Sequence, residues 1–115
     1  MDLNALELAA HAPVVLYLQS PKEKVWGLLL SVGTAGIVLR GLDLVVFDDW
    51  MRQEARGDEP MIGLSTVFYP MHRVERMERD ETIGPIVSYA DRFAQEAGRT
   101  VLETLGVVPV KDEGP

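Results

Sequence analysis

The stretch KVWGLLLSVGTAGIVLRG, residues 24–41, decides the fold of this chain. Residues 24–32 and 37–40 are rich in apolar and β-branched side chains, which favours two strands. Between them, the two glycines of Gly33-Thr34-Ala35-Gly36 supply the positive φ of a tight hairpin turn at little cost. Gly27 lies in the middle of the longer strand, where the missing side chain permits a sharp bend. The stretch therefore predicts a strongly bent β-hairpin.

Three further strands are predicted on either side of this hairpin. Val14–Gln19 precedes it, and Met61–Tyr69 and Val74–Arg79 follow it, with the β-branched and aromatic residues typical of strands. The segment Pro70-Met71-His72-Arg73 separates the last two, and it predicts a 3₁₀-type corner because Pro70 cannot donate to a strand ladder. We therefore expect a mainly β fold with added helices, in which five bent antiparallel strands close into a small SH3-like barrel.

Two helices are expected in the first two thirds of the chain. Residues 2–10 carry leucines among good helix formers and predict a short N-terminal helix. Residues 44–63 form a long insertion between the third and fourth strands. The insertion begins with an apolar run, Leu44–Phe47, which we expect to be extended. A short helix capped by Asp48 or Asp49 and ended by Gly57 should follow this run.

The C-terminal part predicts one amphipathic helix. Ser88 and Asp91 have the spacing of a capping box. Apolar residues then recur at intervals of three or four: Ile86, Ala90, Phe93, Ala97, Val101 and Leu105. We expect one barrel domain over residues 1–83 with its insertion at 44–63. A helix over residues 84–106 should pack on the barrel or on a neighbour, and residues 107–115 should form a flexible tail.

The composition excludes several classes of function. The 115 residues include 18 acidic and 11 basic side chains, a net charge of −7, and no cysteine. An acidic chain repels phosphate at long range, so only a local basic site would bind a nucleic acid strand. The absence of cysteine excludes thiolate zinc sites and fits a cytoplasmic protein. The apolar runs are too short to cross a bilayer, so we expect no membrane association.

The sequence contains no signature of catalysis. It has no nucleophile elbow, no phosphate-binding loop and no zinc-protease motif, so we expect no catalytic residues, no metal and no cofactor. Asp43, Asp48 and Asp49 cluster, but their spacing matches no calcium loop. An enzyme would require a pocket that joins His72 to carboxylates across a subunit boundary.

Two parts of the chain resemble a known family. Residues 25–41 resemble the first motif of the Sm-like (LSm/Hfq-type) small β-barrel family, with a glycine in the strand, a turn, and an apolar strand that ends in a polar loop. The segment Tyr69-Pro70-Met71-His72-Arg73-Val74 stands in the place of the second motif. The resemblance covers roughly residues 3–79. It implies an Sm-like barrel that forms a closed homo-oligomeric ring.

The resemblance also implies which residues meet between subunits. In that family the fourth strand of one subunit pairs with the fifth strand of its neighbour. Here the matching segments are Leu64–Tyr69 and Val74–Arg79. An independent reason is that two strand edges of a small barrel must be paired or protected. The expected interface residues are Leu64, Thr66, Phe68, Val74 and Arg76.

Single-stranded RNA is the partner that the resemblance implies. Arg40, in the loop that matches the first motif, and His72 and Arg73, in the second, are the candidate contacts. A guanidinium grips phosphate in bidentate fashion, and an imidazole stacks on a base or donates to it. The structural alternative is that Arg73 bridges to a neighbouring carboxylate while His72 is a surface or interface residue. Five aromatic residues would either stack on bases or belong to the core and interface: Trp26, Phe47, Trp50, Phe68 and Tyr69.

Three functions stay open at this point. The first is a ring-forming binding or scaffold protein that carries single-stranded RNA. The second is an oligomeric protein-interaction module with no nucleic-acid role, which the acidic balance and the long insertion favour. The third is an enzyme. The alternative fold is another SH3-like barrel that stays monomeric.

Overall fold

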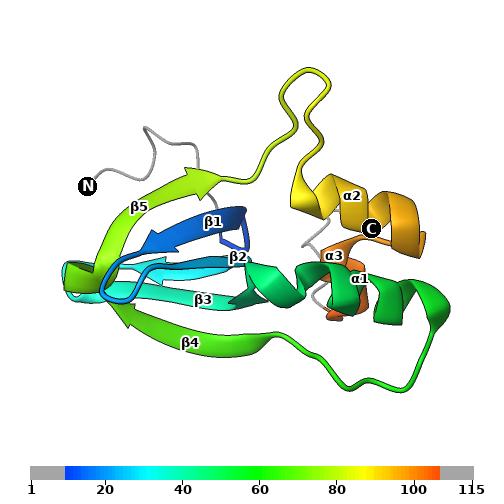
Figure 1. Ribbon diagram of the computed structural model, residues 1–115, viewed down its shortest axis with the longest axis horizontal. Coiled ribbons are helices and arrows are strands. Elements are labelled where there is room, and N and C mark those ends of the chain that lie inside the picture. The colour runs from blue at the N-terminus through cyan, green and yellow to red at the C-terminus, as the bar shows by residue number, and fades with distance from the viewer. Residues whose placement is uncertain (1–9, 107–115) are drawn as a thin grey trace, which may run out of the picture.

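The computed structural model describes residues 10–106 (Figure 1). Five strands form one antiparallel sheet in the order β4-β3-β2-β1-β5. The strands are β1 (Pro13–Leu18), β2 (Glu23–Val32), β3 (Gly36–Asp43), β4 (Ser65–Pro70) and β5 (Val74–Arg79). The helices are η2 (Leu44–Val46), α1 (Phe47–Arg56), η3 (Met71–Arg73), α2 (Tyr89–Ala97) and α3 (Val101–Thr104). Apart from Ala10, the predicted N-terminal helix and the predicted tail over residues 107–115 lie outside the described residues.

The five predicted strands, the β2–β3 hairpin and the corner are present, but neither Gly33 nor Gly36 has the positive φ that the sequence predicts for the turn. The start of the insertion also differs from the prediction. Leu44–Phe47 is not extended, because it forms η2 and the first residue of α1. The cause is Asp43, whose carboxylate accepts a 2.9 Å hydrogen bond from the backbone N–H of Val45 and so caps the turn. The prediction of Asp48 or Asp49 as the cap is therefore wrong. The helix does end at Gly57, which has a positive φ of 69°.

The sheet is curled but open, so the prediction of a closed barrel is wrong. β4 and β5 lie at opposite ends of the strand order, and no ladder among residues 10–106 joins them. The two strands converge only at η3 (Figure 1). There the backbone N–H of Met71 donates to Ala35 in the β2–β3 turn, and the side chain of Arg73 donates to Pro21 in the β1–β2 turn. Both ends of β2 therefore lie near one corner, although ten extended residues would span about 30 Å.

Two facing glycines allow β2 and β3 to bend this far. Gly27 and Gly41 lie opposite each other in the β2–β3 ladder. A Cβ atom added to Gly41 would lie 2.2 Å from the carbonyl oxygen of Trp26, and one added to Gly27 would lie 2.8 Å from that of Arg40. No side chain fits at such distances, so only glycine is compatible with this close approach, and β3 continues through Gly41 to Asp43.

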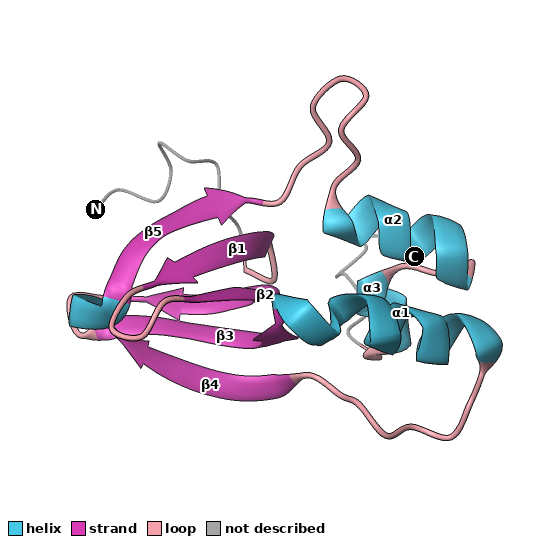
Figure 2. Cartoon of the chain, in the orientation of Figure 1, coloured by secondary structure: helices cyan, strands magenta, loops and turns pink. Residues whose placement is uncertain are grey.

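Alternating residues of the strands form two cores. One core lies inside the curl and contains Val14, Leu16, Leu18, Val25, Leu29, Ile37 and Leu39. The other lies between the outer face of the sheet and the helices α1, α2 and α3, which gather beyond one end of the strands (Figure 2). It contains Trp26, Phe47, Trp50 and Phe93, with the rings of Trp50 and Phe93 stacked 4.6 Å apart. The inward residues of the curl and the helical layer together cover both faces of the sheet.

The C-terminal segment is two helices rather than one. α2 ends at Gly98, which has a φ of 75°, and α3 begins after a capping box between Thr100 and Glu103. Phe93 and Val101 are buried in the core beside α1, so the segment packs on its own chain. None of the helices in residues 10–106 has the length and apolar character that a membrane crossing requires.

Candidate functional site

The predicted corner does bring His72 and Arg73 to the surface of the curl, but the side chain of Arg73 is already bound to other residues of the chain. The Arg73 guanidinium donates from Nε to the Gln19 carbonyl at 3.2 Å and from Nη2 to the Pro21 carbonyl at 2.8 Å. It also forms a 3.0 Å ion pair with Glu23. Arg73 thus holds the β1–β2 turn against the corner. This arrangement is the structural alternative, in which Arg73 bridges to a neighbouring carboxylate.

His72 is exposed, and Arg40 lies apart from it. The backbone carbonyl of His72 accepts a 3.3 Å hydrogen bond from Gln19, while its side chain is exposed. Arg40 pairs with Leu28 and Thr66 in the middle of the sheet and is half-buried. It lies four residues along β3 from Gly36, a rise of about 13 Å from the corner end of the strand. The structure therefore does not bring the three candidate RNA contacts together.

A basic hollow that sequence reasoning missed lies beside the corner. The hollow has a volume of about 320 Å³, and Tyr17, Lys22, Lys24 and Arg76 contribute to its lining together with Glu23 and Glu75. Tyr17 faces Lys24 on β2 and Arg76 on β5, so three adjacent strands build the site. These residues lie far apart in sequence, and only the strand register places them in one row.

The charges in the hollow surround the tyrosine ring. The Arg76 guanidinium lies 4.1 Å from the ring centroid of Tyr17, and Lys24 Nζ lies 5.5 Å from it. The Tyr17 hydroxyl donates a 3.0 Å hydrogen bond to Glu78. A side-chain hydrogen bond with Tyr17 is the main cause that raises the pKa of Arg76, so this cation keeps its charge. Arg76 also forms a 3.2 Å ion pair with Glu78, so the arrangement offers mainly Lys22 and Lys24, beside a half-buried ring, to an anionic ligand.

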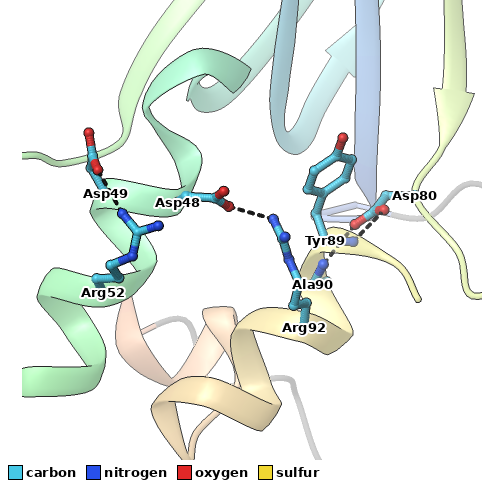
Figure 3. Close-up of polar contacts among 7 residues, drawn as sticks. All are labelled: Asp48, Asp49, Arg52, Asp80, Tyr89, Ala90 and Arg92. Atoms are coloured by element: carbon cyan, nitrogen blue, oxygen red, sulfur yellow. Dashed lines mark hydrogen bonds and ion pairs between the residues drawn. The ribbon is translucent and has the colours of Figure 1, made fainter. Parts of the chain in front are cut away.

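The clustered aspartates Asp43, Asp48 and Asp49 have structural partners. Asp48 forms a 2.6 Å ion pair with Arg92 on α2, and Asp49 forms a 3.0 Å ion pair with Arg52 one turn along α1 (Figure 3). Asp43 caps η2. Across residues 10–106, no three or more histidine, aspartate or glutamate side chains are grouped so that they could hold a metal ion.

The aromatic residues do not form a stacking platform. Trp26, Phe47 and Trp50 are buried in the core beneath the helices. Phe68 is 51% exposed, and its ring lies over Gly36, where an added Cβ atom would come within 2.8 Å of it. Tyr69 is half-buried inside the curl. Burial is the main cause that raises the pKa of its hydroxyl, and the charge of Glu23 adds to the effect.

The two terminal strands are the remaining candidate site. Within the described part of the chain, no strand pairs with the outer edge of β4 or β5. The Met71 N–H donates to the carbonyl of Ala35, and this bond fixes which residues of β4 are hydrogen-bonded to β3. Because an antiparallel ladder alternates, the backbone groups of Thr66 and Phe68 then point outward.

The predicted interface residues lie at these edges with different exposure. Thr66, Phe68 and Arg76 are exposed. Leu64 is half-buried against the core beneath the helices, and Val74 is half-buried at the rim of the curl. Comparisons of this chain with family models, curated proteins and solved structures found no match.

Proposed function

We propose that this chain is a homo-oligomeric scaffold module of the Sm-like type, in which β4 of one copy pairs with β5 of the next to form a ring. The observation that carries the proposal is the pair of terminal strands, each six residues long, at opposite ends of the sheet. An exposed strand edge offers a row of backbone donors and acceptors to another chain. A heterologous pairing of two different edges closes into a ring when the rotation between copies permits it.

The side chains along the two edges support such a pairing. Phe68 on β4 is 51% exposed and offers apolar surface next to the outward backbone groups. On β5, Glu75, Arg76 and Glu78 are exposed, and charged side chains along an edge strand discourage indiscriminate pairing. The two edges therefore differ in character, with apolar surface on β4 and charge on β5.

The proposal is tested with Thr66→Pro. Proline removes the outward N–H of Thr66 without removing a hydrogen bond of the β3–β4 ladder, so the monomer should fold and assembly should be lost. Thr66→Ala keeps the N–H and is the matched control. Size-exclusion chromatography with light scattering should give an oligomer for the native protein and for Thr66→Ala, and a monomer for Thr66→Pro. A monodisperse native monomer at micromolar concentration would exclude the proposal.

Single-stranded RNA is a second candidate ligand, favoured by the basic hollow beside the exposed His72. The pairing of cations with a half-buried aromatic ring at the edge of the hollow suits a phosphate next to a base. Filter binding at low salt should show retention of a single-stranded RNA. The retention should weaken when Lys22 and Lys24 are both replaced by alanine, because two phosphate contacts are lost. The affinity should then also depend less steeply on the salt concentration.

Arg56→Ala is the control for the RNA test, since Arg56 is an exposed cation at the last turn of α1. Replacement of Arg73 would be a poorer probe because it would also release the β1–β2 turn. If no RNA is retained at low salt, the RNA role fails. The oligomeric protein-interaction module, which the net charge of −7 favours, is then left.

A further inference from the structure

A rigid hairpin with an apolar tip projects from the molecule between β5 and α2 (Figure 1). Ile83 and Ile86 exchange two backbone hydrogen bonds of 2.9 and 3.0 Å, and Gly84 makes the turn with a φ of 57°. At the base of the hairpin, the hydroxyl of Thr82 donates a 2.6 Å hydrogen bond to Asp91 on α2. The hairpin therefore holds a fixed shape before it meets any partner.

The tip of this hairpin exposes three large apolar side chains. Ile83 is 64% exposed, Ile86 is 70% exposed and Val87 is 43% exposed. We call these three residues the hairpin tip. Their exposure is not a by-product of a loose loop, because the backbone that carries them is hydrogen-bonded. Contiguous exposed apolar surface of this kind is typical of an interaction site.

A second exposed apolar pair lies near the start of β4. Val45 in η2 is 82% exposed, and Met61 in the segment before β4 is 84% exposed. We call these two residues the flank. Gly41 pairs with Ser65, so the end of β3 and the start of β4 lie at the same end of the sheet. The buried side chain of Gln53 accepts hydrogen bonds from the N–H groups of Met61 and Ile62 at 2.8 and 3.0 Å, which holds this segment in place.

The proposed edge pairing would bring the tip of one copy to the flank of the next. β4 runs into the corner and β5 runs out of it, so the two strands point in opposite directions in space (Figure 1). If a copy of the same orientation lays its β5 along β4, the pair is antiparallel, and the end of β5 lies beside the start of β4. Ile83 follows the end of β5 by four residues, and Met61 precedes the start of β4 by four residues.

We propose that the hairpin tip docks on the flank of the neighbouring copy, so that each subunit interface contains an apolar contact beside the paired strands. This inference rests on the proposed assembly through β4 and β5. In Figure 1 the hairpin between β5 and α2 and the segment that leads into β4 lie on opposite sides of the molecule, so within one chain the hairpin does not cover that segment. Both surfaces are preorganised, so docking costs little ordering entropy.

Engineered cysteines test the contact directly, because the chain has no cysteine of its own. Met61→Cys and Ile83→Cys proteins are mixed and oxidised, and the products are separated on a non-reducing gel. The mixture should give a cross-linked pair that neither protein gives alone. The double variant should give a ladder of covalent multimers. Gln95→Cys, an exposed residue on α2, replaces Ile83→Cys as the control and should give no such pair.

A second measurement separates this inference from the proposed function. Replacing Ile83 and Ile86 together by serine should raise the concentration of half-dissociation about tenfold or more, since buried apolar contacts contribute strongly to association. Circular dichroism should be unchanged because both side chains are exposed. If the native protein assembles, Thr66→Pro does not, and the serine variant dissociates like the native protein, the docking is wrong and the edge pairing stands. If the native protein is monomeric, both fail.

Discussion

At the scale of single residues, one carboxylate ties the sheet to the C-terminal helices. Asp80 follows β5 and accepts a 2.9 Å hydrogen bond from the indole N–H of Trp26. It also accepts 2.9 Å hydrogen bonds from the backbone N–H groups of Tyr89 and Ala90 (Figure 3). Two of these donors belong to the first turn of α2, where a negative charge is also favoured by the helix dipole. In the sequence Asp80 stands in a charged run typical of a solvated strand face. Its role depends on contacts with residues far away along the chain.

Replacing Asp80 by alanine should lower the free energy of unfolding by about 2–4 kcal/mol, because three donors lose their acceptor. Asp80→Asn should have a smaller effect, since the amide keeps one acceptor oxygen. Urea denaturation measures both. Asp58→Ala, in the exposed loop after α1, is the control and should change stability by less than about 0.5 kcal/mol. If Asp80→Ala and Asp58→Ala unfold at the same urea concentration, the proposed role of Asp80 is wrong.

The hydroxyl of Tyr69 should make the free energy of unfolding decrease at high pH. Burial raises the pKa of its hydroxyl in the folded state above the ordinary value of 10.0. Above pH 10 the unfolded chain therefore loses this proton first, and the free energy of unfolding decreases as the pH rises. Below pH 10 the hydroxyl is neutral in both states and the effect is absent. Tyr69→Phe should remove this part of the decrease. Denaturation curves at pH 9 and about pH 11 test it, and an equal decrease in both proteins would contradict it.

At the scale of secondary-structure elements, the bend of the β2–β3 hairpin depends on the contact between Gly27 and Gly41. A Cβ atom on Gly41 would lie 2.2 Å from the Trp26 carbonyl and 2.7 Å from the Gly27 Cα atom. The neighbours are backbone atoms and cannot turn away. We expect that Gly41→Ala forces the two strands apart and opens the curl.

Gly41→Ala should therefore cost about 3 kcal/mol or more of stability, as overpacking does in a dense interior. Gly33→Ala is the matched control, because a Cβ atom at Gly33 meets nothing within 4 Å. Thermal melting followed by circular dichroism compares the two variants. A melting temperature of Gly41→Ala equal to that of Gly33→Ala would show that the strands do not approach as closely as described.

The elements that the sequence predicts correctly are those set by neighbouring residues. β5 and the 3₁₀ corner follow from Pro70 and the strand residues around it. β5 has the predicted bounds, and the corner begins one residue later than predicted, because Pro70 is the last residue of β4. The break between α2 and α3 carries a local signal that the apolar periodicity hides, the capping box of Thr100 and Glu103. β4 begins at Ser65 rather than at the predicted Met61. The backbone N–H groups of Met61 and Ile62 donate to the side chain of Gln53 rather than to β3.

At the scale of the whole molecule, the open sheet leaves two unlike edges that a partner copy can join. If assembly occurs through them, the folded state is stabilised by mass action, and the melting temperature depends on protein concentration. The native protein should melt at a higher temperature at about 100 μM than at about 1 μM. Thr66→Pro should melt at one temperature throughout. Differential scanning fluorimetry measures both, and a concentration-independent native melting temperature would contradict assembly.

The sequence by itself determined where the chain extends and where it turns, since glycine, proline and β-branched residues act on their own backbone and on near neighbours. It did not determine the site. Arg73 holds the β1–β2 turn, and the strand register brings Tyr17 next to Lys24 and Arg76. β4 and β5 stay apart at opposite ends of the sheet. Each of these arrangements depends on contacts between residues that are distant along the chain. Those contacts depend on how far the strands curl, and the close approach of two glycine backbones in the tertiary structure sets that curl.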